Sequence, residues 1–363
     1  MSRREFSYRP YNSAALQPPV VVAQTYLSLR KGPRILLNFH PSHGLSLIST
    51  GRAASAIAAV LPDARWSGLG SAVEPFEVRL IPGKGFGMVA TQFISKTTTI
   101  LLDPPRVIAS AQLPSFLSQN QGQTLFDQAL KQLAEADREL VLGLDKSLGG
   151  TDMEDILKTN TFSCQLHDGA QRDSYMCLFP LVARINHACR PNAHARFIPK
   201  TLLMEIKALR DIKPGEEIAI SYGRIDLQHV QRQQLYKQGW NFTCTCDMCT
   251  ASAHDMAASD QRRARFAQLR KKLENLTPET YNAQQIVGWE KEIMELSGKE
   301  GLDLLLAPDF ERLAYVYAGH CMVVEARTWA MKARETLLEW TVVEDGLHDD
   351  MARIEELLLE LKS

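Results

Sequence analysis

Residues 184–249 contain three short motifs that together decide the fold of this chain. Residues 184–197 read RINHACRPNAHARF, residues 216–223 read EEIAISYG, and residues 240–249 read WNFTCTCDMC. Each motif alone is a modest signal, whereas their order and spacing together are specific. The rest of the chain is organised around this stretch.

The third motif supplies a cluster of thiols. Cys244, Cys246 and Cys249 follow the spacing CxCxxC, and zinc takes four ligands in a tetrahedral arrangement. The cluster can provide three thiolates, and Cys189 in the first motif is the best candidate for the fourth. Three unpaired cysteines, or a disulfide, are the plain alternative, but clustered thiols in a reduced chain usually hold a metal. A nucleic-acid zinc finger is disfavoured because no CxxC/HxxxH partner set lies nearby and the flanking residues are not basic.

The series NHxCxPN, ExxISYG and an aromatic residue followed by CxCxxC resembles the catalytic half of a SET-domain protein-lysine methyltransferase. The CxCxxC spacing is similar to that of the SMYD (SET and MYND) group and its fungal relatives. Upstream, residues 81–90 (IPGKGFGMVA) resemble the opening SET hairpin, so the resemblance covers roughly residues 77–249. Because no cysteine lies between Leu80 and Thr159, the MYND finger of that group is absent from the SET region, and MYND-dependent partners are not expected.

The resemblance implies a binding site for S-adenosylmethionine (AdoMet). The residues at the family's cofactor-binding positions are Lys84, Gly85, Phe86, Asn186, His187, Tyr222 and Phe242. Backbone of the first three is expected to touch the cofactor, and the amide and imidazole of Asn186 and His187 to fix its two ends. Phe242, or alternatively Trp240, is expected to cover the adenine once a structural zinc folds the post-SET loop. Without the resemblance, a GxG turn and an Asn-His pair are ordinary features of a hairpin and a polar loop.

Tyr222 is the residue that the resemblance assigns to catalysis, through its place after ExxIS and before Gly223. Methyl transfer from a sulfonium to an amine is an in-line displacement, so alignment of the reacting atoms does much of the work. The substrate lysine must lose its proton, although its ordinary pKa is about 10.4. An apolar channel beside the AdoMet cation favours that loss, and the Tyr222 hydroxyl would orient the amine. No metal is needed for the chemistry.

The predicted function is therefore AdoMet-dependent methylation of a lysine in a histone or another protein, so the expected partner is a protein substrate that presents a lysine. The alternative is a catalytically weak SET protein that serves as an interaction module. Such a module would bind a protein partner through its helical C-terminal domain.

Composition limits the other function classes. The chain has 363 residues and a net charge of -1, which gives no field that would attract nucleic acid, so direct nucleic-acid binding is not expected. No apolar run approaches the ~20 residues of a membrane helix, so no membrane partner is expected. Residues 1–62 hold seven Lys or Arg and one acid, Glu5, which fits a poorly ordered basic arm, a mispredicted gene start, or a mitochondrial leader. The expected location is nuclear and/or cytoplasmic.

The predicted fold class is α+β. It comprises a SET-domain β-fold of small pseudoknotted sheets with a helical insert, a post-SET zinc loop and an α-helical, TPR-like C-terminal domain. The predicted segments are a loop-rich, partly disordered arm at 1–70, a SET domain at 71–223 with a helical insert at about 106–158, a zinc loop at 224–250 and a helical domain at 251–363. Turn-forming residues interrupt any sustained period in the arm, which otherwise shows only a short helix near 52–61.

The C-terminal domain is predicted to begin with a small-residue linker at 251–260. Its helices are expected at about 261–276, 283–297, 308–319, 322–340 and 347–361. Apolar spacing from Phe310 to Ala333 matches one tetratricopeptide (TPR) unit, and since a solenoid needs about three, a bundle with one TPR-like hairpin is predicted. Partner binding and plain core packing are both open interpretations of that hairpin. Two groups of charges are interpreted as solvated, namely the six Lys or Arg of residues 261–272 and the turn residues Glu216 and Glu217.

Overall fold

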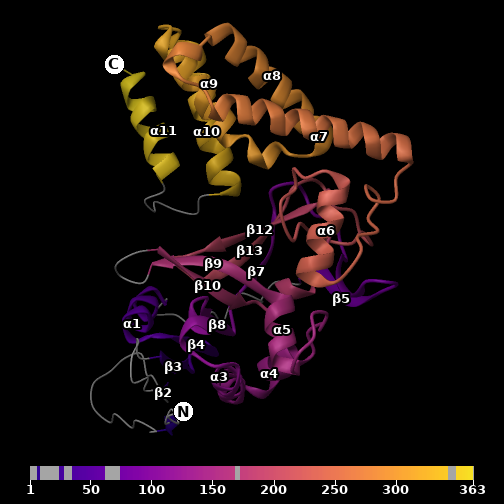
Figure 1. Ribbon diagram of the computed structural model, residues 1–363, viewed down its shortest axis with the longest axis vertical. Helices are drawn as coiled ribbons and strands as arrows, with labels where there is room; N and C mark the ends of the chain where they lie inside the picture. Colours follow the sequence, from indigo (N-terminus) through magenta and orange to yellow (C-terminus); the bar gives the residue numbers. More distant parts are fainter. Residues whose placement is uncertain are drawn as a thin grey trace. The chain divides into compact units, whose positions relative to one another are not determined.

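The structure, a computed structural model, describes residues 6–8, 24–27, 35–61, 74–167, 172–341 and 349–362. The chain divides into two compact units. The first contains Met1–Asn186, Asn192–Ile220 and Gly239–Asn241, and the second contains His187–Pro191, Ser221–Gln238 and Phe242–Ser363. Figure 1 colours the chain from indigo at the N-terminus, through the magenta strands and insert helices, to the yellow helices at the C-terminus. The stretch of residues 184–249 thus contributes to both units.

A seven-stranded sheet is the largest sheet among the described residues, with the order β1-β2-β3-β4-β8-β10-β9. Its strands are β1 (Phe6–Tyr8), β2 (Gln24–Leu27), β3 (Ile35–His40), β4 (Leu45–Thr50), β8 (Val107–Ser110), β10 (Arg172–Leu178) and β9 (Thr161–His167). Neighbouring strands are antiparallel except β4 and β8, which run parallel.

Residues 35–61 correct the prediction of a loop-rich arm. Strands β3 and β4 form a hairpin in which Leu37 and Ile48 face each other in register, and both side chains are fully buried. Helix α1 (Gly51–Val60) follows, capped by the Thr50 side chain, and agrees with the predicted short helix. The strands were missed because short apolar runs in a buried sheet lack the alternation that identifies an exposed strand. Apart from β1 and β2, the rest of the arm at 1–34 and 62–70 lies outside the described residues.

Two of the three smaller sheets lie wholly within the first unit. Strands β5 (Phe76–Ile81) and β6 (Gly85–Ala90) form the expected glycine-rich hairpin. A three-stranded sheet has the order β12-β13-β7, with β12 (Ala193–Ile198), β13 (Leu203–Ala208) and β7 (Thr99–Asp103), and contains the expected hairpin of residues 193–208. The short strands β11 (Asn186–His187) and β14 (Ala219–Ile220) lie within the first and second motifs, respectively.

The insert is helical for most of its predicted length. It contains α2 (Leu113–Phe116), α3 (Gln119–Gln132), α4 (Glu135–Leu142) and α5 (Asp152–Asn160). The prediction is wrong at the start of the insert, where Val107–Ser110 is the central strand β8. All four of its side chains are buried, and a run this short gives no helical or strand period. After the insert, the single turn η1 (Val182–Arg184) leads into the first motif.

Helices dominate the second unit. They are α6 (His229–Trp240), α7 (Ala253–Glu274), α8 (Ala283–Glu300), α9 (Ala307–Gly319), α10 (Val323–Trp340) and α11 (Asp349–Glu360), with the short turns η2 (Pro278–Thr280) and η3 (Asp303–Leu305). The predicted linker at 251–260 is wrong because the Ser252 side chain accepts the Asp255 N–H at 3.1 Å and caps α7. Among the described residues, no helix is both long enough and apolar enough to cross a membrane.

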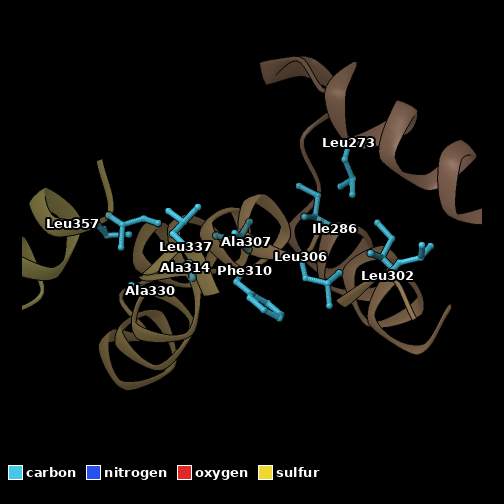
Figure 2. Packing of buried hydrophobic residues seen from close by; sticks show 14 of the residues in the cluster. Leu273, Ile286, Leu302, Leu306, Ala307, Phe310, Ala314, Ala330, Leu337 and Leu357 are labelled. Carbon is cyan, nitrogen blue, oxygen red and sulfur yellow. The ribbon is translucent and has the colours of Figure 1, made fainter. Parts of the chain in front are cut away.

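One apolar cluster joins the C-terminal helices. Figure 2 shows Leu273 of α7, Ile286 of α8, Phe310 of α9, Leu337 of α10 and Leu357 of α11 among its members. The facing surfaces of α9 and α10 also carry small buried residues, which allow close helix packing, and the list is Ala314, Ala326, Ala330 and Ala333. A TPR-like identity for this hairpin stays a prediction.

The four arginines of the basic run of α7 are not simply solvated, which corrects that interpretation for them, whereas Lys271 and Lys272 are exposed as expected. The arginines pair with acids of α8 and α9, and the pairs are Arg262–Glu300, Arg263–Glu300, Arg265–Glu292 and Arg270–Asp309. Arg263 and Glu300 are fully buried. These partners lie 27 to 39 residues away along the chain, so the local sequence gave no sign of them.

Glu290 of α8 makes the stability of these helices dependent on pH. Its side chain is completely buried beside Asp309 and contacts Arg312. Burial, together with the Asp309 charge, raises the pKa of Glu290 from its ordinary value of 4.5 to about 8. The folded chain therefore holds a proton that the unfolded chain releases, so this contribution is complete below about pH 4.5 and is lost as the pH rises toward 8.

Glu290→Gln is expected to flatten this dependence, because the amide has no proton to lose. The variant should gain about 2 kcal/mol of stability relative to the original chain at pH 8, and less at pH 5. Thermal unfolding of both proteins across this pH range measures the difference. Glu295→Gln, at an exposed site on the same helix, is the matched control and should keep the original slope. Equal slopes for all three proteins would contradict the assignment.

Candidate functional site

The turn of the β5–β6 hairpin is anchored by Glu217 of the second motif. Lys84 Nζ lies 2.6 Å from Glu217 Oε2, and Asn186 Nδ2 donates to Glu217 Oε1 at 3.0 Å. Asn186 Nδ2 also lies 3.4 Å from the Phe86 carbonyl oxygen. One carboxylate thus connects the glycine-rich turn to the first motif, and the interpretation of Glu217 as a solvated charge is wrong.

Two glycines shape this turn for different reasons. Gly85 has a φ of +76°, which L-residues with side chains rarely adopt. At Gly87 the limit is space, since an added Cβ would lie 2.3 Å from Ile81 Cδ1 and 2.6 Å from Asn186 Nδ2. The missing side chain at Gly87 is therefore what allows the Asn186 amide to approach the hairpin.

Buried polar side chains hold the motifs in place within the first unit. Asp103 Oδ2 accepts the N–H groups of Leu181 and Val182 at 2.8 and 2.9 Å, which fixes the turn that precedes Asn186. Burial raises the pKa of Asp103 to about 7, although these two hydrogen bonds oppose the shift. Asn192 accepts the Ala219 N–H at 2.8 Å and donates to the Glu217 carbonyl oxygen at 2.8 Å, which fixes the strand before Tyr222.

In the second unit, Tyr222 belongs to a group of four rings. The His187 centroid lies 5.5 Å from that of Tyr222 and 4.0 Å from that of Tyr236. Phe242 stacks on Tyr236 at 5.5 Å and meets Tyr222 edge-on at 6.1 Å. The Tyr222 N–H donates to His187 Nδ1 at 3.2 Å. Phe242 therefore lies beside Tyr222, whereas Trp240 Nε1 donates to the Thr159 carbonyl oxygen within the first unit.

The four cysteines predicted as metal ligands lie together in the second unit. The sulfurs of Cys189, Cys244, Cys246 and Cys249 are all within 4.8 Å of one another. Cys189 Sγ lies 3.8 Å from Cys244 Sγ and 3.5 Å from Cys249 Sγ. A tetrahedron with Zn–S bonds of about 2.3 Å places its sulfurs about 3.8 Å apart, so the donor set fits a zinc ion in number, chemistry and spacing.

Side chains of helix α6 contact this cluster. Gln233 accepts the Cys244 N–H and donates to the Cys244 carbonyl oxygen, both at 2.9 Å. Tyr236 is fully buried, and its Oη lies 3.9 Å from Cys189 Sγ. Arg232 is 1% exposed, and burial alone would lower its pKa, but the nearby Cys189 and Cys249 sulfurs raise it. A buried cation next to four sulfurs offsets the negative charge of their thiolate forms.

The thiols also influence one another's ionisation. Hydrogen bonding with the Cys189 and Cys244 thiols lowers the pKa of Cys249 to about 7 and lowers that of Cys246 further. The corresponding bond with Cys189 raises the pKa of Cys244. A metal ion bound by all four sulfurs would replace the protons that remain on the cluster.

The structure places every predicted site residue in one of two local groups. Lys84, Gly85, Phe86 and Asn186 lie around Glu217 in the first unit, and the others lie around the His187 ring and the cysteine cluster in the second. Sequence reasoning missed Tyr236, Arg232 and Gln233. Their only signal was the position of α6 directly before the CxCxxC motif.

Comparison with known proteins gives a family for the region around these groups. Residues 85–223 match the SET domain family. Protein-lysine N-trimethyltransferase SMYD5 of Mus musculus is 40% identical over 82 residues, which cover 22% of this chain and 20% of that protein. N-lysine methyltransferase SMYD2 of Homo sapiens is 39% identical over 88 residues, covering 24% and 19%. Histone-lysine N-methyltransferase set5 of Schizosaccharomyces pombe is 26% identical over 195 residues, covering 53% and 56%.

The chain spans about a fifth of the two SMYD proteins and about half of set5. The matched family region includes Gly85, Asn186, His187 and Tyr222. The expectations of a SET-domain, α+β fold and of SMYD-type relatives are therefore confirmed. Residues 85–223 are a SET domain, and parts of the chain are similar to SMYD-group and set5 lysine methyltransferases.

Proposed function

We propose that this chain is an AdoMet-dependent protein-lysine N-methyltransferase. The observation that carries the proposal is that the matched SET region contains Tyr222 near its end, and that the Tyr222 backbone N–H donates to His187 of the NHxCxPN motif. Relatives named as lysine methyltransferases support the reaction class. The substrate would be a lysine in a histone or another protein, and a nuclear and/or cytoplasmic location would give access to it.

AdoMet would supply a methyl group on a cationic sulfonium. The turn around Gly85 suits a ligand that approaches the backbone, because an added Cβ there would meet only the Asp145 carboxylate group, whose oxygens lie at 3.7 Å. The Tyr222 and Phe242 rings offer apolar faces, and the Phe242 ring is the candidate cover for the adenine. The Tyr222 hydroxyl would accept or donate a hydrogen bond at the lysine nitrogen and so align it for displacement.

Zinc is proposed as a structural ion held by Cys189, Cys244, Cys246 and Cys249. Closed four-thiolate sites of this kind contribute to folding and leave no open position for substrate. The ion would tie residue 189 to the loop that carries Phe242. The chain's own contribution is to provide four thiols, of which those of Cys189 and Cys244 are buried, with Arg232 as a compensating cation.

Calorimetric titration of zinc-loaded protein with AdoMet and with S-adenosylhomocysteine tests the proposal. Micromolar affinity is expected, and Phe242→Ala should weaken it because the proposed cover is lost. Phe93→Ala, at a phenylalanine that is 56% exposed in the first unit, is the matched control and should bind normally. A folded, zinc-loaded protein that binds neither compound would overturn the proposal, and the helical C-terminal domain would then be studied as an interaction module.

A further inference from the structure

We propose that His187 is a positioning residue that connects the cysteine cluster to Tyr222. The inference builds on the proposed function. The contact between His187 and Cys189 concerns metal binding, however, and can be tested without any methyl transfer. One imidazole nitrogen holds the backbone of Tyr222 and the other holds the sulfur of Cys189. Metal binding at the cysteine cluster is thereby coupled to the position of Tyr222.

The hydrogen bonds determine which nitrogen carries the proton. His187 Nδ1 receives the Tyr222 N–H at 3.2 Å, and a backbone N–H can only donate. Nδ1 must therefore present its lone pair, so in the neutral ring the proton lies on Nε2. Nε2 is 3.4 Å from Cys189 Sγ, in a contact with the geometry of a hydrogen bond to sulfur. In this tautomer Nε2–H is the donor and the Cys189 sulfur is the acceptor.

An acceptor role for Cys189 is the role of a metal-bound thiolate, which has no proton of its own. Ligands of structural zinc commonly receive hydrogen bonds from neighbouring groups, and these bonds orient the ligand and tune its affinity. Here the neighbouring group is an imidazole whose second nitrogen is already bonded to Tyr222. Metal binding at Cys189 thus favours the ring orientation that also anchors Tyr222.

Packing prevents the ring from turning away. His187 is 5% exposed, and its centroid lies 4.0 Å from that of the fully buried Tyr236. Tyr236 in turn stacks on Phe242 with an interplanar angle of 6°, and its hydroxyl lies 3.9 Å from the same Cys189 sulfur. A thiolate at Cys189 would accept hydrogen bonds from both His187 and Tyr236. Cys189 is therefore the ligand through which metal binding at the cluster can affect the positions of His187 and Tyr236.

Two substitutions separate the two hydrogen bonds of His187, one with the Tyr222 N–H and the other with the Cys189 sulfur. In His187→Asn, the side-chain oxygen can take the place of Nδ1 and accept the Tyr222 N–H, but the side chain does not reach the sulfur. In His187→Gln, the longer amide can place an N–H near the Nε2 position and donate to Cys189, but it does not supply the acceptor at Nδ1. The Asn variant is expected to bind zinc about 10- to 100-fold more weakly, as for loss of a hydrogen bond to a metal ligand.

The Gln variant should show the opposite pattern, with zinc affinity much closer to that of the original protein and a larger loss of kcat. Zinc affinity is measured by competition with a chromophoric chelator, and kcat and KM for AdoMet are measured under saturating zinc. Tyr236→Phe keeps the stacked ring but removes the hydroxyl, so it should weaken zinc binding in the same direction as the Asn variant. His320→Gln is the control, since His320 lies 3.3 Å from Tyr281 Oη among the C-terminal helices and should affect neither quantity.

Each outcome decides a different point. Parallel losses of zinc affinity and kcat in the Asn and Gln variants would show that His187 acts only as packing, and the coupling would be wrong. Normal zinc affinity in both His187→Asn and Tyr236→Phe would also overturn it, even if one of the variants were inactive. If the variants show the expected differences in zinc affinity while the original protein binds no AdoMet, the proposed enzymatic function fails. In that case the role of the His187–Cys189 hydrogen bond in zinc binding is still supported. Should both His187 variants fail to fold, normal zinc affinity in Tyr236→Phe alone would contradict the proposal.

Discussion

Tyr222→Phe is expected to lower the rate of methyl transfer by about 10²–10³-fold, the usual loss when one transition-state hydrogen bond is removed. The substitution removes only the hydroxyl, and the ring can keep its contacts with His187 and Phe242 at centroid distances of 5.5 and 6.1 Å. The backbone N–H that bonds His187 is also unchanged. AdoMet affinity should therefore stay close to that of the original protein while kcat falls.

The measurement combines a radiolabelled methyl-transfer assay on protein arrays with calorimetry of AdoMet binding. Tyr281→Phe, a half-exposed tyrosine of the C-terminal helices, is the matched control and should keep full activity. Full activity in Tyr222→Phe would remove Tyr222 from catalysis. A parallel loss of AdoMet binding would instead assign the hydroxyl to the cofactor.

Cys246→Ser is expected to abolish stable zinc binding and to destabilise the second unit. Structural zinc sites contribute about 10–16 kcal/mol of binding free energy near neutral pH, and a serine hydroxyl is a poor replacement for a thiolate. The remaining three sulfurs would lie beside the buried Arg232 without a metal ion to organise them. The loop that carries Phe242 should then loosen, and AdoMet affinity should fall with it.

Metal analysis by mass spectrometry should find about one zinc per chain in the original protein and almost none in the variant. Thermal unfolding should show a clear drop for Cys246→Ser. Cys321→Ser is the control, because Cys321 is exposed and lies outside the cluster. Freshly purified, reduced protein without zinc would contradict the assignment of the cluster.

Local chemistry could be predicted from the sequence where it depends on neighbouring residues. The CxCxxC spacing brings three sulfurs together whatever the rest of the fold does, and the glycine-rich turn of residues 81–90 forms a hairpin for reasons of backbone geometry alone. The five C-terminal helices follow from apolar periodicity, which is also a local property. For Tyr222 and Asn186, the motif order was needed, because a single tyrosine or asparagine carries no such signal.

Partners distant in sequence could not be predicted in this way. Glu217 is 133 residues from Lys84, and its charge is indistinguishable from that of a solvated turn residue until the fold brings the two together. The same holds for the α7 arginines and for Arg232, whose burial depends on neighbouring elements. Strand β8 was mistaken for helix because its identity comes from β4 and β10 on either side, and not from its own four residues.

The sequence by itself thus determined the SET-type motifs, the thiol cluster and the helical C-terminal domain, since each depends on the spacing of residues that lie close together in the chain. Only the tertiary structure decided that His187 uses one nitrogen for Tyr222 and the other for Cys189, and that Tyr236 and Arg232 lie against the same cluster. The reason is physical. Hydrogen-bond roles and buried charges depend on distances of a few ångströms between residues that spacing along the chain does not determine.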